Sequence, residues 1–493
     1  MIVSGIYLTR RQSSADDYFR AGRTIPAWAV SISFLATTLS AATFIGGPQQ
    51  SYRGDLTYLS SNIGSILAIV IVAIFFIPLY YKLNVDTVYG LLRVRFGTPA
   101  SLAASLAFLV GRLFASGARL YIAALPASFI VYGDISLEHQ IISISVLTLI
   151  GIFYTYAGGI RTVIWTDVIQ VLIFVSAALI GMAILIDKIP ISVPEVITAL
   201  QDSDVNGQSK LTVLKFGIFN FDPKSSYTLL TAIFGFSLLS LGAYGTDHDM
   251  AQRLLTCKNA VKGSKSAIWG VLLGLPVTAV FMFLGLWMFI YYSRPEIMGE
   301  FAPAYAVEGS RKIFLTFILN EMPAGLKGIM MAGLFAAALS SLNSAINSMS
   351  SSMVNDIYKL VRPRKSEREY LSVGRKGVLA FGLMLGLFAV ISVYWQAARP
   401  ETTLIDFALM VMVFAYSGLT AVYLLAIFTK RGNNISIISA LIAGFVSVFF
   451  MQMFFAGKLA FPWQMFIGTS FSFVIGILGS QSDPKSLQFE TSQ

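Results

Sequence analysis

Residues 27–50, AWAVSISFLATTLSAATFIGGPQQ, predict a membrane helix whose backbone is interrupted. The stretch is apolar over about 20 residues, the length that crosses the hydrocarbon core of a bilayer. It is also dense in Ser and Thr, and it ends with Gly46, Gly47 and Pro48, which weaken a helix. Interrupted backbone exposes carbonyl groups that lipid cannot satisfy, so this segment must face a cavity or an ion.

The whole chain has the composition of a membrane protein. Its 493 residues are 56% hydrophobic and 12% charged, with a mean hydropathy of +0.73. A soluble domain carries about 25% charged residues. We therefore predict an all-α polytopic membrane protein, a single transmembrane domain over residues 1–493 with about twelve membrane helices. The predicted spans lie near residues 27–49, 57–81, 99–132, 140–157, 162–187, 229–249, 266–293, 325–358, 377–396, 403–429, 435–455 and 459–480.

The sixth predicted span contains a second interruption. Residues 231–250 read TAIFGFSLLSLGAYGTDHDM and include Gly235, Gly242 and Gly245. Interrupted helices at matching places in two halves of a chain are typical of transporter binding sites. In the alternative interpretation, these glycines only allow neighbouring helices to pack closely.

The positions of the two interruptions predict the organisation of the chain. The first and sixth spans correspond if spans one to five and six to ten form two halves. We therefore predict an inverted-repeat core of five plus five helices, with helices one and six broken. Residues 27–187 form the first repeat, residues 229–429 form the second, and residues 435–480 form two extra C-terminal helices.

The net charge of +10 is explained by orientation in a membrane. Most Lys and Arg residues fall in short loops on one side of the predicted spans, and cytoplasmic loops carry such an excess. We therefore predict that residues 1–26 and the C-terminus are cytoplasmic. The protein is expected to be multi-pass in the plasma membrane, which is the inner membrane of a bacterium. The expected partners are the lipid bilayer and small solutes, with no nucleic acid and no obligate protein partner.

The sequence also excludes several enzyme classes. Cys257 is the single cysteine, which excludes an internal disulfide and a Cys-based zinc site. There is no P-loop lysine motif, no HExxH and no convincing dinucleotide fingerprint. We therefore expect a transporter and not an enzyme. The opening MIVSGIYLTRRQ is typical of the last turns of a helix that either begins upstream or is absent from this protein.

The eighth span is rich in hydroxyl groups. Residues 330–358 read MMAGLFAAALSSLNSAINSMSSSMVNDIY. Ser340, Asn343 and Ser344 are spaced i, i+3 and i+4 and therefore share one helical face. Neutral oxygens on one face suit a monovalent hard cation. In the alternative interpretation, the serines let helices pack closely and hydrogen-bond across an interface.

Asp167, Arg112 and Arg119 are ionisable residues well inside predicted spans. Asp167 lies in RTVIWTDVIQVLIF, and an intramembrane carboxylate is a functional candidate, although an early helical turn would also favour it. Arg112 and Arg119 are seven residues apart and share a helical face. Either could bind a substrate carboxylate with two hydrogen bonds. Arg112 is expected instead to snorkel or to pair with a carbonyl.

A charged group closes the sixth span. Asp247, His248, Asp249 and Arg253 follow one another closely at its predicted cytoplasmic end. We expect a solvated helix end, and a salt-bridged gate is the alternative.

Four stretches, taken together, resemble the sodium/solute symporter family. This family includes bacterial sialic acid, galactose and proline symporters and the animal sodium–glucose cotransporters. The resemblance implies a leucine-transporter-like fold with five plus five helices. The matching stretches are ADDYFRAGRTIPAWAVSISFLATTLSAATFIG (15–46), YTYAGGIRTVIWTDVIQ (154–170), YGTDHDMAQRLLTCKN (244–259) and GLFAAALSSLNSAINSMSSSMVNDIY (333–358).

The resemblance also implies a sodium site between the first and eighth spans. Its ligands would be the backbone carbonyls of Ala36, Leu39 and Ala337. The hydroxyl groups of Ser340 and Ser341 would complete it.

Some members have a second sodium site nearer the cytoplasm. The matching positions here are Asp167, Ser340, Asn343 and Ser344. Members with that site commonly have Ser where Asn343 stands, and the amide oxygen of Asn343 can still coordinate.

For the solute, the resemblance to the sialic acid members implies several contacts. Their first interrupted helix supplies side chains that match Thr38, Ser40 and Thr43, and a polar residue on their second span matches Asn62. Their carboxylate-binding Arg has no counterpart in register, and Arg119 lies one turn later in this chain.

These observations predict a sodium-coupled symporter that imports a small organic solute by alternating access. The solute would be a sugar, a sugar acid such as sialic acid, or another small carboxylate or amino acid, and Na⁺ is the expected coupling ion. One alternative is a proton-coupled symporter that uses Asp167. The other is a channel-like or sensor-like membrane protein.

Overall fold

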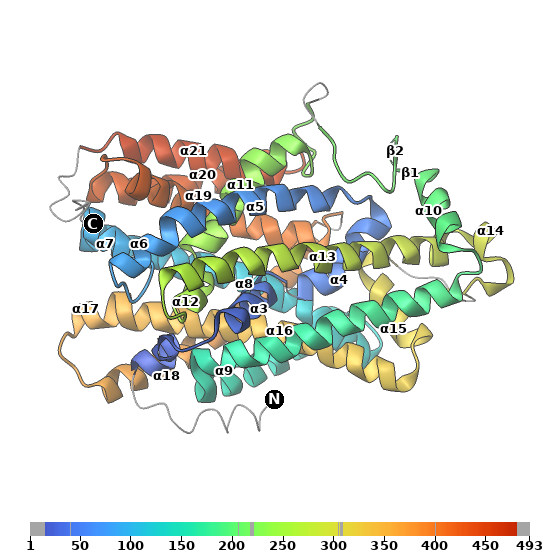
Figure 1. Ribbon diagram of the computed structural model, residues 1–493, viewed down its shortest axis with the longest axis horizontal. Coiled ribbons are helices and arrows are strands. Elements are labelled where there is room, and N and C mark those ends of the chain that lie inside the picture. Colours follow the sequence, from blue (N-terminus) through green and yellow to red (C-terminus); the bar gives the residue numbers. More distant parts are fainter. Residues whose placement is uncertain are drawn as a thin grey trace.

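The computed structural model describes residues 15–480 except 40, 206, 217–220, 304, 306–308 and 400. Within these residues the protein is a bundle of helices, most of which lie along its long axis (Figure 1). Its strands form one short antiparallel hairpin, β1 (Asp204–Val205) with β2 (Gln208–Ser209). The all-α prediction is therefore confirmed.

Each of the twelve predicted spans corresponds to an apolar helix in the described part of the chain. Nine helices are long and apolar enough to cross a membrane, and a tenth span is formed by a bent pair. Two shorter apolar segments complete the set. The nine are Thr57–Lys82 (with α5, Ser61–Ile71, and α6, Ile77–Lys82), α8 (Thr98–Tyr132), the two parts of α9 (Leu137–Lys188), α13 (Ala260–Ser293), Ala324–Val361 (with α16, Ala324–Ser352, and α17, Lys359–Val361), α18 (Glu367–Ala397), α19 (Leu404–Phe428) and α20 (Asn434–Phe454).

The remaining elements are the bent pair, the two short apolar segments and several short helices in the loops. The bent pair is α3 (Ala27–Thr38) with α4 (Ala41–Arg53). The short apolar segments are Thr231–Thr246, which contains α11 (Ser237–Leu241), and α21 (Phe461–Ile477). The other short helices are α2 (Ala15–Arg20), α7 (Gly90–Phe96), α10 (Val193–Gln201), α12 (His248–Leu254), α14 (Pro295–Met298) and α15 (Ile313–Glu321).

The first span is broken at Leu39, as its polar sequence predicts. Leu39 has extended backbone angles (φ −92°, ψ 121°), and the axes of α3 and α4 differ by 54°. The Gly46–Pro48 segment, in contrast, lies inside the continuous helix α4. A Cβ added at Gly46 would lie 2.8 Å from Ile405 Cγ1, so this glycine allows α4 to approach α19. The residues of low helix propensity, Gly46 to Pro48, therefore mark a site of close helix packing. The break in the span lies seven residues before Gly46.

The break in the sixth span lies at Asp247, where the backbone is extended (φ −81°, ψ 119°) before α12 begins. The preceding glycines are helical, in part in wider π-helical turns. A Cβ at Gly242 would lie 2.5 Å from Thr420 Oγ1, and one at Gly245 would lie 2.8 Å from Phe76. The close-packing interpretation is therefore correct for these glycines. The Asp247 side chain fixes the break by accepting a hydrogen bond from the Asp249 amide and capping α12.

The loop after β2 fastens the second half of the broken first span. Lys210 is buried and donates hydrogen bonds to the carbonyl oxygens of Ser51 (3.2 Å), Tyr52 (2.9 Å) and Gly54 (2.7 Å). These carbonyls lie at the end of α4, where helical partners are missing and a cation is favoured. Burial lowers the pKa of Lys210 to about 8. The loop thus holds the orientation of α4 from outside the spans.

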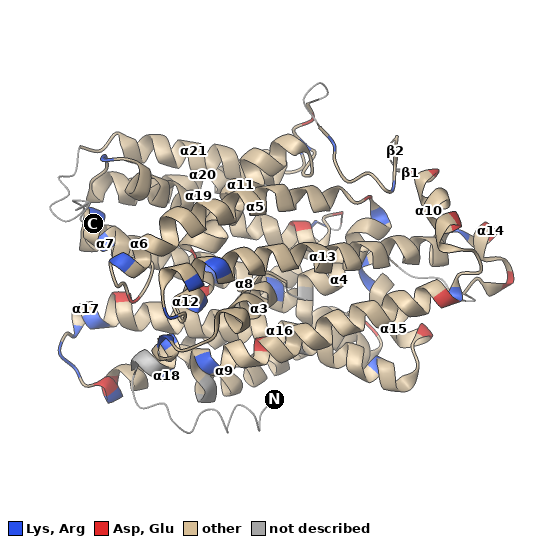
Figure 2. Ribbon diagram, in the orientation of Figure 1, with Lys and Arg blue, Asp and Glu red and all other residues tan. Residues whose placement is uncertain are grey.

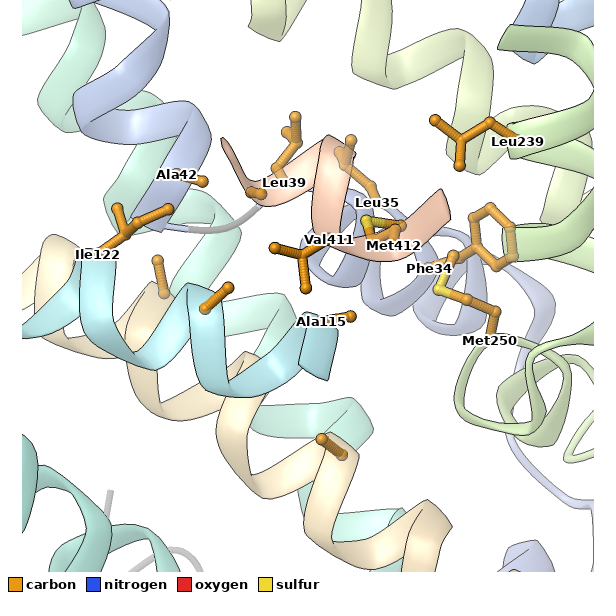
Figure 3. Packing of buried hydrophobic residues seen from close by; sticks show 14 of the residues in the cluster. Phe34, Leu35, Leu39, Ala42, Ala115, Ile122, Leu239, Met250, Val411 and Met412 are labelled. Atoms are coloured by element: carbon orange, nitrogen blue, oxygen red, sulfur yellow. The ribbon is translucent and has the colours of Figure 1, made fainter. Parts of the chain in front are cut away.

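Charged residues lie mainly toward the two ends of the bundle, and long uncharged stretches of α13 and α16 separate them (Figure 2). This distribution is expected for helices that cross a hydrocarbon layer. Helix α13 packs on both halves of the broken first span, and α16 packs on α9. Figure 3 shows buried side chains from α3, α4, α8, α11, α12 and α19 around the break at Leu39. The core of the bundle therefore positions the broken segment against the hydroxyl-rich eighth span.

Candidate functional site

A cavity of about 130 Å³ lies beside the break in the first span. Four of the five predicted solute residues line it, although they come from four different helices. Ser40, the fifth, lies outside the described residues. The four are Thr38 on α3, Thr43 on α4, Asn62 on α5 and Arg119 on α8. The structure thus brings these residues to one place, and their role as solute ligands stays a prediction.

Arg119 is the cationic group of this cavity with the fewest contacts. Its Nη2 lies 3.6 Å from the sulfur of Met412, and the side chain is half-buried. Within the described part of the chain it forms no ion pair, whereas Arg112, also at the cavity, pairs with two carboxylates. A guanidinium group with free N–H donors in a cavity suits a carboxylate, which it binds with two parallel hydrogen bonds.

Several further polar residues line the cavity and were not predicted from the sequence. The hydroxyl groups of Ser65 and Ser240 lie 3.1 Å apart, on α5 and on the sixth span. Ser61 and Ser65 flank Asn62 at helical spacing, which is a signal that the sequence does contain. These hydroxyl groups fit a polyhydroxylated solute. The additional polar lining residues are Thr37, Tyr58, Ser61, Ser65, Ser240, Tyr244, Thr278 and Tyr416.

The first predicted sodium site coincides with a small second cavity. Ala36, Leu39, Ala337 and Ser340 line this space of about 10 Å³, roughly the room that one water-sized particle requires. Helix α3 ends at Thr38, and carbonyl groups at the C-terminus of a helix lack intrahelical partners, although that of Leu35 accepts from the Leu39 amide at 2.9 Å. The broken first span and the hydroxyl-rich eighth span therefore meet here.

Two buried oxygens on the helices that form this cavity have no hydrogen-bond partner among the described residues. They are Oε1 of Gln170, which lines the cavity, and the hydroxyl of Ser341, the fifth predicted ligand, which follows the lining residue Ser340 on α16. A buried polar atom without a partner is costly and calls for an explanation such as a bound ion. Unpaired oxygens beside free carbonyls are the donor set that an alkali cation requires. The residues present therefore fit sodium as cargo, and Gln170 is a candidate ligand missed by the sequence analysis.

The residues of the second predicted sodium site are only partly brought together. Asp167 accepts hydrogen bonds from Ser340 through Oδ1 and from Ser33 through Oδ2, the latter at 2.5 Å. Asn343 is instead engaged with another helix, since its Oδ1 accepts a hydrogen bond from Thr155 at 3.1 Å. Asp167 is thus fully buried and hydrogen-bonded to the eighth span, and its role as a sodium ligand stays a prediction.

The guanidinium group of Arg253 lies between two of these residues. Its Nη2 is 3.5 Å from Asp167 Oδ2 and donates to the hydroxyl of Ser344. Its Nε donates to Ser33 at 3.0 Å. In this structure a protein cation therefore contacts the carboxylate and one hydroxyl that were predicted to bind a second sodium.

The charged group at the end of the sixth span is buried, so the expectation of a solvated helix end is wrong. Arg112 Nη1 lies 3.0 Å from Asp247 Oδ2, and its Nη2 pairs with Asp249. Arg253 Nη1 lies 2.8 Å from Asp249 Oδ1. Arg112 is 2% exposed and the other three are at most 1% exposed, so Arg112 does not snorkel. His248, also buried, contacts the hydroxyl of Ser351 at 3.2 Å.

This network fastens the break in the sixth span to the third and fifth spans. The pairs are Arg112 with Asp247 and Asp249, then Asp249 with Arg253, then Arg253 with Asp167. With every side chain ionised, two cations and three anions leave a net charge of −1.

Comparison with known proteins identifies the family. The model of the sodium:solute symporter family matches residues 18–444. The sodium/sialic acid symporter NanT of Aliivibrio fischeri is 30% identical over 475 residues, which cover 96% of this chain and 89% of that protein.

Solved structures agree with this result. A Na⁺-coupled sialic acid symporter in a substrate-bound outward-open state matches with a TM-score of 0.82 and 27% identity, over 98% of this chain and 96% of that one. Mhp1, a nucleobase-cation-symport-1 transporter in a closed conformation, matches with a TM-score of 0.54 and 14% identity, over 94% and 93%, and shows the fold alone. Sodium is thus the coupling ion, and the proton-coupled and channel alternatives are set aside. The chain belongs to the sodium:solute symporter family and is a sodium-coupled secondary transporter of a small solute, not an enzyme.

Proposed function

We propose that this protein imports a small polyhydroxylated carboxylic acid, with sialic acid as the first candidate, and that Arg119 binds the carboxylate. The observation that carries the proposal is the half-buried guanidinium of Arg119, without a carboxylate partner among described residues, in a cavity lined by hydroxyl and amide groups. The two matched proteins named for sodium-coupled sialic acid transport support the same solute class.

Transport follows alternating access between the two repeats, residues 27–187 and 229–429, with residues 435–480 outside the repeated core. Sodium binds where the break at Leu39 meets Ser341 and so favours the conformation that binds solute. By linkage, solute raises sodium affinity by the same factor. Each positive charge that moves inward gains about 2.3 kcal/mol per 100 mV of membrane potential.

The protein resides in the plasma membrane, the inner membrane of a bacterium, with residues 1–26 and the C-terminus in the cytoplasm. This orientation follows from the excess of Lys and Arg on that side. The loops that contain α10, β1, β2, α14 and α15 are then outside. The lipid bilayer and the solute are its partners, without an obligate protein partner.

The region around Asp167 takes a second cation only when Arg253 moves. In the present arrangement Arg253 contacts both Asp167 and Ser344. A single sodium ion at the Leu39–Ser341 site is therefore the minimum stoichiometry.

Uptake into proteoliposomes tests the proposed function. An inward sodium gradient should drive accumulation of N-acetylneuraminate, and replacement of sodium by potassium or choline at fixed pH should abolish it. The methyl ester of the same sugar should not accumulate, because it lacks the charge that Arg119 binds. Accumulation that continues in potassium, or that follows a pH step without sodium, would refute the coupling ion. A sodium-driven flux of the ester alone would refute the carboxylate.

Substitution of a single hydroxyl tests the sodium site. Ser341→Ala should weaken the sodium dependence of uptake about tenfold in half-saturating concentration, the loss of one ligand contact of about 1.4 kcal/mol. Ser348→Ala is the matched control on the same helix, because that hydroxyl bonds to the Ala345 carbonyl at 3.0 Å. Equal sodium curves for the two variants would remove Ser341 from the site.

A further inference from the structure

A second large cavity, about 460 Å³, lies at the end of the bundle that the proposed orientation places outside. It is formed where the loop between α18 and α19 meets the loop between α20 and α21. Two cationic residues line it, Arg399 and the exposed Lys224. Two acidic residues, Glu401 and Asp406, also line it. Nothing in the function described so far uses this cavity.

The acidic groups of this cavity are already engaged with other residues. Glu401 Oε2 pairs with Arg53 Nη2 at 3.0 Å. Asp406 accepts a hydrogen bond from the hydroxyl of Tyr227. Arg399, in contrast, forms no ion pair within the described residues. The cavity therefore presents a guanidinium group whose charge no carboxylate of the described chain compensates.

Arg399 is held in place by two buried amide side chains. Its Nη1 donates to Gln452 Oε1 at 2.8 Å, and Gln452 Nε2 donates to Gln464 Oε1 at 2.6 Å. Gln464 Nε2 in turn donates to the Leu459 carbonyl at 2.7 Å. Gln452 and Gln464 are 5% and 2% exposed. The guanidinium group also contacts the Met410 sulfur through Nη1 at 3.3 Å and the Gln452 carbonyl through Nη2 at 3.4 Å. This chain of hydrogen-bonded buried amides fixes the orientation of the guanidinium group and leaves its other N–H donors for a ligand.

An aromatic partition separates this outer cavity from the central one. The ring of Tyr227 lies 5.4 Å from that of Tyr58 and 5.7 Å from that of Phe236, and Phe236 lies 5.6 Å from Phe461. Tyr58 and Phe236 line the central cavity, whereas Phe461 and Asp406 line the outer one. The Tyr227–Asp406 hydrogen bond fastens this partition to α19. These rings therefore lie between residues that line the outer cavity and residues that line the central one.

We propose that the outer cavity is a docking site for the carboxylate group of the solute, with Arg399 as its ligand. The proposal rests on the proposed function, because it takes the same class of organic acid. The solute binds first at Arg399, in a wide cavity that needs no sodium. It passes the aromatic partition only when the Tyr227–Asp406 contact opens, and Arg119 then takes the carboxylate.

Protection of an introduced thiol tests the docking site directly. Thr402→Cys, which lines the outer cavity, is made in a Cys257→Ser background and labelled with a maleimide in detergent, in potassium buffer without sodium. N-acetylneuraminate at about ten times its Kd should slow labelling about tenfold by mass action. Its methyl ester should not slow labelling. Arg399→Gln should abolish the protection, and Lys224→Gln, the matched control in the same cavity, should retain most of it.

The outcomes separate this proposal from the proposed function. Protection that survives Arg399→Gln, or that the methyl ester or chloride gives equally, overturns the docking site. Arg399→Lys keeps the charge and should keep partial protection, which guards against a folding defect in the Gln variant. Wild-type uptake in a sodium gradient is measured separately. Protection without sodium-driven uptake would refute the proposed function and support the docking site. Sodium-driven uptake without protection would support the proposed function and refute the docking site.

Discussion

Replacement of Arg112 by Met is expected to destabilise the protein by about 3–5 kcal/mol, the usual penalty when one partner of a buried ion pair is removed. Met keeps an unbranched apolar stem but lacks the guanidinium group, so the loss is mainly that of the charge and its hydrogen bonds. Arg112 is 2% exposed and pairs with Asp247 and Asp249, which are both buried. Without it the net charge of the network falls from −1 to −2. The measurement is thermal unfolding of the detergent-solubilised chain, together with the yield of monodisperse protein.

A surface pair and a compensating substitution make this prediction specific. Arg53→Met removes an exposed pair with Glu401 at 3.0 Å and should change stability by less than about 1 kcal/mol. In the Arg112→Met, Asp249→Asn double variant, one of the two carboxylates that lost their Arg112 partner is removed. This variant should recover part of the stability lost in Arg112→Met. Equal melting temperatures for Arg112→Met and Arg53→Met would show that the buried network does not hold the sixth span.

The spans were predictable from the sequence because their signal is local. A membrane helix needs only length and hydrophobicity, which a window of about 20 residues contains. The positions of the breaks were less accessible. In the sixth span Gly242 and Gly245 are helical, and the backbone opens at Asp247, whose side chain caps the next helix. The sequence does not distinguish a glycine that permits a break from a glycine that permits close packing. Only the position of the neighbouring helix separates the two roles.

Most of the central cavity was predictable only through the family resemblance, whereas Arg119 was a candidate from its place within a predicted span. Thr38, Asn62 and Arg119 come from three helices that no sequence period relates, yet they line one space. Arg112 was expected to pair with solvent or a carbonyl because its partner Asp247 is 135 residues away in the sequence. Gln170 was missed because a single amide on an apolar helix has no pattern. Long-range partners of this kind emerge only when the helices are packed.

Arg119→Gln is expected to raise the KM for the carboxylate solute at least about 30-fold, because loss of one partner of a buried charge pair weakens binding by about 2 kcal/mol or more. Little stability should be lost, since Arg119 contacts the Met412 sulfur at 3.6 Å and forms no ion pair within the described residues. Initial rates of sodium-driven uptake of N-acetylneuraminate in proteoliposomes provide the KM. Arg161→Gln is the matched control, because that guanidinium bonds to Thr24 and the Ala21 carbonyl, away from the cavity.

The comparison of acid with ester decides whether Arg119 recognises charge or only shape. A guanidinium group distinguishes a carboxylate from its methyl ester through charge and two parallel hydrogen bonds, and Gln supplies neither the charge nor the fork. The variant should therefore lose preference for the acid, while its affinity for the ester stays near that of the wild type. Arg119→Lys should fall between the two, since it keeps the charge without the planar geometry. If the acid-to-ester ratio of Arg119→Gln equals that of the wild type, another group binds the carboxylate. Arg112 is the other guanidinium group at this cavity. It could bind the carboxylate only by leaving Asp247 and Asp249, which would disturb the buried network.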